Sequence, residues 1–183
     1  MVEQTVILRW RLVITCSTAP IYNMIKFTLL FVLSFIISIF FTLTVLAQNL
    51  EEEVDCLSEA LYFEARSESF IAQLAVGNVI YNRVKSSKFP NTFCGVVHQA
   101  NKTKNGKLIK HKCQFSYYCD GKEETFYNGL AYEKVVKIAY LVLEDVSVEF
   151  LGEALYYHAV YVNPSWAKHK KYLGRAGLHK FYK

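Results

Sequence analysis

The sequence lacks the signals that mark several common protein classes. It has three prolines among 183 residues. No Pro-rich linker, internal repeat or low-complexity stretch follows residue 50, which indicates a single domain there. Phosphate-binding loops, dinucleotide fingerprints, Gly-x-Ser-x-Gly elbows and zincin His-Glu pairs are absent. At 52% hydrophobic and 20% charged residues, the composition excludes a disordered chain, a collagen-like repeat and a long coiled coil.

Aromatic residues are abundant, and the apolar excess lies near the start of the chain. There are 13 Tyr and 13 Phe, which provide surfaces for burial and for stacking on sugars or bases. Residues 27–47 carry no charge and follow Lys26. A short basic start, an apolar core and the end Val45-Leu46-Ala47 are typical of a secretory signal. The core is also long enough to span a bilayer as an uncleaved anchor. We expect cleavage after Ala47.

Both alternatives export residues 48–183, because the basic residues before the apolar core stay on the inner side. Residues 1–23 fit neither part of a signal, so we expect translation to begin at Met24 and this extension to be an over-predicted start. Residues 24–47 are then the signal peptide or anchor, and residues 48–183 the exported domain. Residues 1–47 contain three of the 21 basic residues and one of the 16 acidic residues. Residues 48–183 therefore have 18 basic and 15 acidic residues and a net charge of +3. So small an excess does not indicate nucleic acid as a partner.

Four cysteines remain in the exported part: Cys56, Cys94, Cys113 and Cys119. An even number in an exported chain indicates two disulfides, for which three pairings exist. We expect Cys113 to pair with Cys119 and close a short loop, and Cys56 to pair with Cys94 and tie the first helix to the loop after the second. Free thiols or a metal site are the alternative, although no CxxC pair supports a metal.

Hydrophobic periodicity predicts an α+β domain. Three helices are expected, over residues 54–66, 70–86 and 124–145. The pair Asn105-Gly106, inside a basic stretch, predicts an exposed hairpin or a flexible loop. The Tyr- and Val-rich run 154–162 ends at Pro164, and residues 177–182 are expected to pair with it. The result is a small antiparallel sheet near the C-terminus.

One carboxylate lies on an apolar helix face. Glu64 falls seven residues after Leu57 and three after Leu61, on the face expected to be buried. Burial disfavours the charged form and raises the pKa of a carboxyl group. A carboxylic acid that stays protonated near neutral pH is what general-acid cleavage of a glycosidic bond requires. The alternative is a structural Glu64 paired with Arg66, Arg83 or a helix N-terminus.

Four other side chains are candidates for the site. Glu68, one turn beyond Glu64, is expected to orient a neighbouring group or to cap the next helix, and an exposed helix-end Glu is the alternative. His158 and His179 could contact substrate or hold a carboxylate. Trp166 could stack on a sugar. Packing within the core is the alternative for the two histidines and the tryptophan.

Seven blocks of sequence occur in a characteristic order. They are CLSEALYFEAR (56–66), AVGNVIYNRV (75–84), FPNTFCGVV (89–97), CQFSYYCDG (113–121), ALYYHA (154–159), Pro164-x-Trp166-Ala167 and GLHKFY (177–182). Over residues 54–182 the chain therefore resembles the catalytic domain of the SleB-like cell wall hydrolases, typified by spore cortex-lytic enzymes. It is most similar to the exported, four-cysteine members from Gram-negative bacteria.

The resemblance implies a small, mainly helical fold related to lysozyme and lytic transglycosylases. In that family the glutamate of the Glu-Ala-Arg motif is the catalytic acid, and it falls on Glu64. The family motif continues Gly-Glu, whereas here Ser67 replaces the glycine and Glu68 keeps the second acid. That leaves the path of the chain between the first two helices open. We expect the substrate-binding residues to be Glu68, Asn82, Gln114, Ser116, Tyr157, His158, Trp166 and His179.

The function expected is cleavage of the β-1,4 bond between N-acetylmuramic acid and N-acetylglucosamine in peptidoglycan, through one catalytic Glu. A lytic transglycosylase that gives 1,6-anhydro products is favoured over a muramidase. A monomer without metal or cofactor is expected, in the periplasm or on the periplasmic face of the inner membrane, attached to the membrane only through its N-terminal segment. Two other classes compete: a metallohydrolase with Glu64, Glu68, His158 and His179 as ligands, and a non-catalytic glycan-binding module.

Overall fold

The structure is a computed structural model that describes the backbone of residues 2–183 and the side chains of residues 24–183. The chain divides into a unit that ends at Gln48 and a compact unit, Asn49–Lys183. The extension expected at residues 1–23 lies outside the residues whose side chains are described. The site and its supporting elements all belong to the compact unit.

Helix α1 (Val2–Ala65) begins in the first unit and ends in the second. Its side chains over residues 27–47 are exposed. The part Met24–Ala65 is long and apolar enough to cross a membrane, a property that signal sequences share. The helix start expected at residue 54 is wrong, because residues 48–53 contain no Gly or Pro that would interrupt α1.

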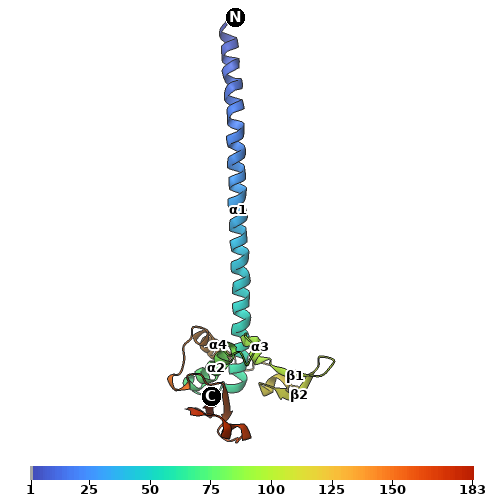
Figure 1. Ribbon diagram of the computed structural model, residues 1–183, viewed down its shortest axis with the longest axis vertical. Coiled ribbons are helices and arrows are strands. Elements are labelled where there is room, and N and C mark those ends of the chain that lie inside the picture. Colours follow the sequence, from blue (N-terminus) through green and yellow to red (C-terminus); the bar gives the residue numbers. More distant parts are fainter. Residues whose placement is uncertain (1) are drawn as a thin grey trace. The chain divides into compact units, whose positions relative to one another are not determined.

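The compact unit combines helices with two small antiparallel sheets (Figure 1), so the α+β class expected from the sequence is confirmed. Its further helices are α2 (Phe70–Lys85), α3 (Phe93–Val97) and α4 (Gly129–Leu143), with 3-10 turns η1 (Ser116–Cys119), η2 (Glu149–Leu151) and η3 (Ser165–His169). Its strands are β1 (Ala100–Lys102), β2 (Leu108–Cys113), β3 (Tyr156–Ala159), β4 (Tyr172–Ala176) and β5 (His179–Tyr182).

Helix α2 is the centre of the hydrophobic core, since every residue over 72–80 is buried. Ser69 begins the helix as its N-cap, with its hydroxyl accepting the N–H of Ala72. Helix α4 packs closely on α2 because Gly77 has no side chain, and a Cβ there would lie 2.7 Å from Val142. The last turns of α1 complete this layer of helices through their fully buried apolar face, which includes Leu57 and Leu61.

The C-terminal sheet has the strand order β3-β5-β4, antiparallel throughout. The expected pairing of residues 154–162 with residues 177–182 is confirmed as β3 with β5, although β3 is shorter than predicted. Strand β4 was not predicted, because Gly174 interrupts its apolar pattern. That glycine is needed for packing, since a Cβ there would lie 2.5 Å from the ring of Phe150.

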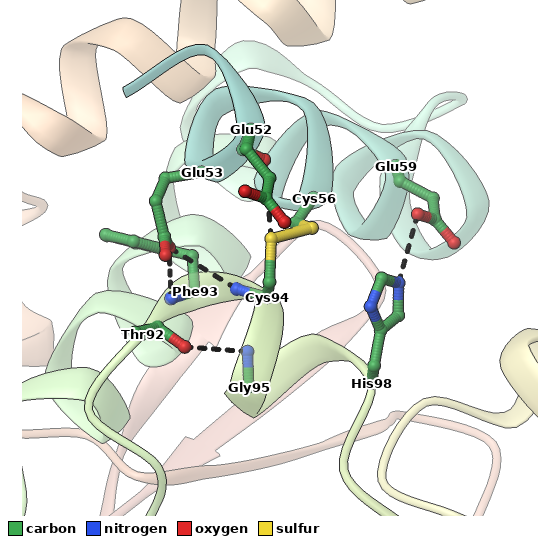
Figure 2. Close-up of a disulfide and its surroundings, with 9 residues drawn as sticks. All are labelled: Glu52, Glu53, Cys56, Glu59, Thr92, Phe93, Cys94, Gly95 and His98. Atoms are coloured by element: carbon green, nitrogen blue, oxygen red, sulfur yellow. Dashed lines mark hydrogen bonds and ion pairs between the residues drawn. A yellow bond between two sulfur atoms is a disulfide. The ribbon is translucent and has the colours of Figure 1, made fainter. Parts of the chain in front are cut away.

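Both expected disulfides are present, and Figure 2 shows the first of them. Cys56–Cys94 ties the last turns of α1 to α3. Beside it, the carboxylate of Glu53 accepts the N–H of Phe93, and the hydroxyl of Thr92 caps the start of α3. Because α3 follows α2 closely in the chain, this cluster fixes α1 against the α2–α3 segment.

Strands β1 and β2 form the hairpin expected around Asn105-Gly106. Its turn is closed by the N–H of Gly106, which donates to Thr103, and Gly106 has the left-handed φ of 79° that such turns favour. Cys113, the last residue of β2, is bonded to Cys119 of η1. The disulfide thus fixes the base of the hairpin to the body of the unit.

Candidate active site

Glu64 lies in the last turn of α1, on the wall of a cavity of about 410 Å³. The opposite wall comes from β3, 93 residues further along the chain, where the hydroxyl of Tyr157 donates to Glu64 Oε2 at 3.3 Å. Six of the nine expected site residues line this cavity: Glu64, Gln114, Ser116, Tyr157, His158 and His179. The fold therefore brings together residues from helix α1, the loop after β2, the 3-10 turn η1 and strands β3 and β5.

The Glu64 carboxyl is partly withdrawn from water. Burial raises its pKa above the ordinary value, while the hydrogen bond from Tyr157 and the positive charge of Arg83 lower it and only partly offset burial. Burial, and then the Glu64 carboxylate, raise the pKa of Tyr157 well above its ordinary value. Tyr157 therefore remains a hydrogen-bond donor at any physiological pH.

Arg83 of α2 supplies a fixed positive charge between the walls of the cavity. The side chain is only 3% exposed, and its Nε donates to the carbonyl of Leu155 at 2.8 Å. Its guanidinium lies over the rings of Phe89, at 5.3 Å, and Tyr157, at 6.0 Å. No ion pair joins Arg83 to Glu64 among the side chains of residues 24–183, so the arginine acts on the carboxyl at longer range.

The two histidines are both buried but differ in their bonding. His158 uses both ring nitrogens: Nδ1 donates to the carbonyl of Ala159 and Nε2 accepts from the hydroxyl of Tyr182, each at 2.9 Å. His179 meets the ring of Tyr157 edge-on, and its Nδ1 is buried without a partner. Burial lowers the pKa of His179, which keeps its ring neutral at neutral pH.

Glu68 does not line this cavity and instead fixes the connection between β4 and β5. Both its carboxylate oxygens lie 3.3 Å from the N–H of Leu178. The contact requires glycine at position 177, where φ is 55° and a Cβ would lie 2.1 Å from Glu68 Oε2. The turn before α2 does not require glycine at Ser67, because the non-Gly residues with positive φ in the described backbone are His111 and Asp145.

Besides Glu68, two expected site residues, Asn82 and Trp166, do not line the Glu64 cavity. The structure places Asn82 on a different side of α2, where its amide donates to the carbonyls of Gly152, at 2.9 Å, and Ala154, at 3.1 Å. Asn82 therefore holds the segment before β3 rather than lining the Glu64 cavity. Trp166 of η3 lines a second cavity of about 450 Å³, together with Tyr156 and Lys170.

Three cavities share residues across the Glu64 site. The Trp166 cavity has Arg83, Gln114 and Tyr157 in common with the Glu64 cavity. A third cavity, of about 500 Å³, shares Phe63 with the Glu64 cavity and is lined further by Tyr127. Glu64 thus lies at the middle of a row of hollows with aromatic side chains at both ends.

Sequence reasoning missed several residues of this row. Arg83, Phe63 and Tyr156 are not among the predicted site residues, although each is adjacent in sequence to one of them. Their roles depend on contacts between elements distant in sequence. Adjacency to Glu64 and Tyr157 was the signal that could have found Phe63 and Tyr156.

The geometry does not favour a metal centre built from Glu64, Glu68, His158 and His179. Within residues 24–183, no three His, Cys, Asp or Glu side chains converge as metal ligands. Both nitrogens of His158 are bonded to protein groups, and Glu68 is held by the backbone of Leu178. A buried, tyrosine-bonded carboxyl in a cavity instead fits acid–base chemistry.

The fold and this carboxyl-centred cavity define an α+β domain of the kind found in enzymes that act on glycans. The family model described as Cell Wall Hydrolase matches residues 67–182, more than half of the chain. The chain belongs to this family, which confirms the resemblance stated from the sequence. The matched segment begins three residues after Glu64 and includes the rest of the cavity lining except Phe63.

Curated relatives are similar over a shorter stretch. The spore cortex-lytic enzyme of Bacillus cereus is 41% identical over 49 residues, 27% of this chain and 19% of that protein. The spore cortex-lytic enzyme of Bacillus subtilis is 40% identical over 47 residues, 26% of this chain and 15% of that protein. The chain thus spans less than a fifth of the length of these relatives.

Two solved structures have a similar fold. The catalytic domain of the germination-specific lytic transglycosylase SleB from Bacillus anthracis superposes with a TM-score of 0.54 at 27% identity, covering 72% of this chain and 93% of that domain. The catalytic domain of the Bacillus cereus SleB protein gives a TM-score of 0.52 at 28% identity, covering 74% of this chain and 91% of that domain. The compact unit therefore has the SleB catalytic-domain fold.

Proposed function

We propose that this chain is an exported enzyme that cleaves the β-1,4 bond between N-acetylmuramic acid and N-acetylglucosamine in peptidoglycan, with Glu64 as the catalytic acid. The observation that carries the proposal is the Glu64 carboxyl in the cavity wall, whose pKa is raised by burial. Membership of the cell wall hydrolase family supports the substrate. The Bacillus anthracis relative, described as a lytic transglycosylase, supports the type of reaction.

The proposed reaction uses Glu64 twice. Protonated Glu64 gives its proton to the glycosidic oxygen as the bond from that oxygen to C1 of muramic acid breaks, which leaves an oxocarbenium-like centre. The 6-hydroxyl of the same sugar then attacks C1, and the Glu64 carboxylate takes the hydroxyl proton. The products are a 1,6-anhydro sugar end and a free 4-hydroxyl, and the enzyme regains its protonated acid.

A single carboxylate is consistent with this route. Of the described residues that line the Glu64 cavity, Glu64 is the only acid. Most glycosidases that use water or a covalent intermediate have a second carboxylate across the scissile bond. The tyrosine hydroxyl of Tyr157 and the charge of Arg83 would stabilise the Glu64 carboxylate that forms when the proton leaves.

The row of three cavities supports a polymeric glycan as the substrate. Sugars bound on either side of the scissile bond would lie in the two outer hollows, one lined by Trp166 and Tyr156 and the other by Phe63 and Tyr127. Aromatic faces in such positions are suited to stacking on pyranose rings.

The N-terminal segment and the disulfides support the proposed export and location. Two disulfides are typical of a chain that folds in an oxidising compartment. We place the compact unit in the periplasm or on the periplasmic face of the inner membrane, as a monomer. The apolar residues 27–47 provide either the signal for export or the membrane anchor.

The test compares residues 48–183 with the Glu64→Gln variant on isolated peptidoglycan, with products read by mass spectrometry. We expect wild type to release muropeptides one water lighter than hydrolysis products, and Glu64→Gln to lower the rate by about 10²- to 10⁴-fold. Glu68→Gln is the matched control, because it neutralises a carboxylate that lies outside the cavity.

Fully hydrated products would keep Glu64 as the acid but identify a muramidase. If wild type releases nothing while it still binds peptidoglycan, the chain is a glycan-binding module and the proposal is wrong. Equal activity of wild type and Glu64→Gln would remove Glu64 from the mechanism.

A further inference from the structure

The β1–β2 hairpin concentrates positive charge on an exposed ribbon. Residues 100–113 contain five lysines and no acidic residue. Every residue over 101–112 is exposed. In Figure 1 the hairpin extends away from α2 and α4. The lysines are Lys102, Lys104, Lys107, Lys110 and Lys112.

These lysines form no ion pair with an acidic side chain of residues 24–183. Three ion pairs form among the side chains of residues 24–183, and none involves the hairpin; they are His98–Glu59, Lys122–Asp120 and Lys183–Glu153. The rest of the region 48–183 has 13 basic and 15 acidic residues once the five lysines are set aside from its 18 and 15. The net positive charge of the exported region therefore comes from the hairpin, since the rest carries a net charge of −2.

The hairpin leads directly into the Glu64 cavity. Cys113, its last residue, lines that cavity together with the following Gln114. The Cys113–Cys119 disulfide fixes this junction to η1. The hairpin also lies near the third cavity of the row, the one lined by Phe63. Lys110 Nζ is 3.8 Å from the position that a Cβ on Gly121 would occupy. The neighbours of Gly121 in the chain, Asp120 and Lys122, line that cavity. A polymer that occupies the row of cavities would pass the base of the ribbon.

We propose that the β1–β2 hairpin is a docking surface for the carboxylates of the peptidoglycan stem peptides, on the strand whose glycan occupies the Glu64 cavity. This inference rests on the proposed function for the identity of the polymer. Glycan strands are uncharged along their sugars, but their stem peptides carry carboxylates at regular intervals. A ribbon of unpaired lysines matches such a series of separate negative charges better than one compact anion, because its cations are spread over two strands.

The physical consequence is binding that depends on salt and on the number of lysines. Exposed pairs are individually weak and are screened within about 10 Å at 0.1 M salt. Several together hold a polymer that already contacts the cavity, so that the same strand would be retained between cleavage events.

The experiment measures retention of the full chain, in detergent micelles and with Glu64→Gln to prevent cleavage, on insoluble peptidoglycan sacculi. The hairpin variant carries Lys→Gln at Lys102, Lys104, Lys107 and Lys112, and keeps Lys110 because it packs near Gly121. The matched control carries Lys→Gln at four exposed lysines elsewhere: Lys88, Lys134, Lys137 and Lys171. A second set of sacculi has its carboxylates converted to amides with a carbodiimide and ammonia.

We expect the hairpin variant to bind native sacculi about tenfold more weakly than its parent at 50 mM salt, with a shallower dependence on salt, and the control to change by less than about twofold. On amidated sacculi, parent and hairpin variant should bind equally weakly. Unchanged disulfides and an unchanged unfolding midpoint in both variants show that the comparison reports binding rather than folding.

Equal losses in the hairpin and control variants would show a general charge effect and overturn the proposal. So would a hairpin contribution that survives amidation, since the partner would then not be a carboxylate. A wild-type chain that cuts nothing would refute the proposed function alone, because this binding difference is measured without cleavage.

Discussion

The Glu64 cavity and the β1–β2 hairpin use charge in opposite ways. In the cavity, one carboxyl is shielded from water and bonded to Tyr157, with Arg83 as the nearby cation. In the hairpin, five exposed lysines form no ion pair with any acidic side chain that the structure describes. Because electrostatic interactions weaken as the surrounding dielectric rises, a single charge can determine chemistry in the first region. In the second, only several charges together can have a measurable effect.

The two regions also differ in how the chain forms them. The hairpin is local: a turn at Asn105-Gly106 brings together strands a few residues apart. The cavity joins Glu64 and Tyr157 across 93 residues and depends on the core of α2 and on the register of β3 with β5. The cavity should therefore be the more sensitive of the two to any change that loosens the fold.

The largest effect should come from the two disulfides, one on the helix that carries Glu64 and one at the base of the hairpin. Cys56–Cys94 spans 38 residues and anchors α1, which carries Glu64; Cys113–Cys119 spans 6 residues at the hairpin base. Loop-closure entropy predicts that replacing both cysteines by Ser lowers the free energy of unfolding by about 4 kcal/mol for the first pair and about 2 kcal/mol for the second. Urea unfolding of residues 48–183 measures both losses.

Activity sharpens this comparison. Loss of Cys56–Cys94 should reduce cleavage of soluble glycan fragments along with stability, because α1 positions Glu64. If loss of Cys113–Cys119 lowered the free energy of unfolding more than loss of Cys56–Cys94, the prediction from loop length would be wrong.

The next effect compares a buried cation with an exposed one. Arg83→Met removes the donor to the Leu155 carbonyl and leaves that buried acceptor unpaired, which should cost about 2–3 kcal/mol of unfolding free energy. Lys104→Met, the same kind of change in the hairpin, should cost less than about 0.5 kcal/mol. Thermal unfolding of both variants and of wild type measures the two losses of unfolding free energy, which can then be compared. Similar losses at both positions would mean that Arg83 is not held as the structure describes.

Sequence reasoning went furthest where structure is local or periodic. The spacing of Leu57, Leu61 and Glu64 identified the carboxyl on the buried face, and Asn105-Gly106 identified the hairpin. The four-cysteine count indicated two disulfides, and the expected pairs are those that form.

The rest depends on contacts that no local pattern encodes. Asn82 was expected at the substrate, but its amide bonds to Gly152 and Ala154, some 70 residues away. Strand β4 was missed because Gly174, which makes room for the Phe150 ring, breaks its pattern. Arg83 is not among the predicted site residues, since its place in the cavity depends on where β3 packs against α2.

The smallest and most specific effect concerns the pH dependence of cleavage. Tyr157→Phe keeps the ring and removes the hydroxyl that donates to Glu64. That hydrogen bond stabilises the charged carboxylate and lowers the pKa of Glu64, so its removal should raise the pKa further above the ordinary value. A general acid must be protonated to act, and activity falls as the pH rises through its pKa. The alkaline limb of the rate profile should therefore move to higher pH in Tyr157→Phe, with a modest loss of maximal rate.

The four-lysine hairpin variant is the control for this shift. The charges that it removes lie in solvent, so the alkaline limb should stay unchanged on soluble glycan fragments at 0.15 M salt. An alkaline limb that moves to lower pH in Tyr157→Phe would contradict the role given to this hydrogen bond. An equal shift in the hairpin variant would show that the pKa of Glu64 responds to the overall charge of the protein rather than to its cavity.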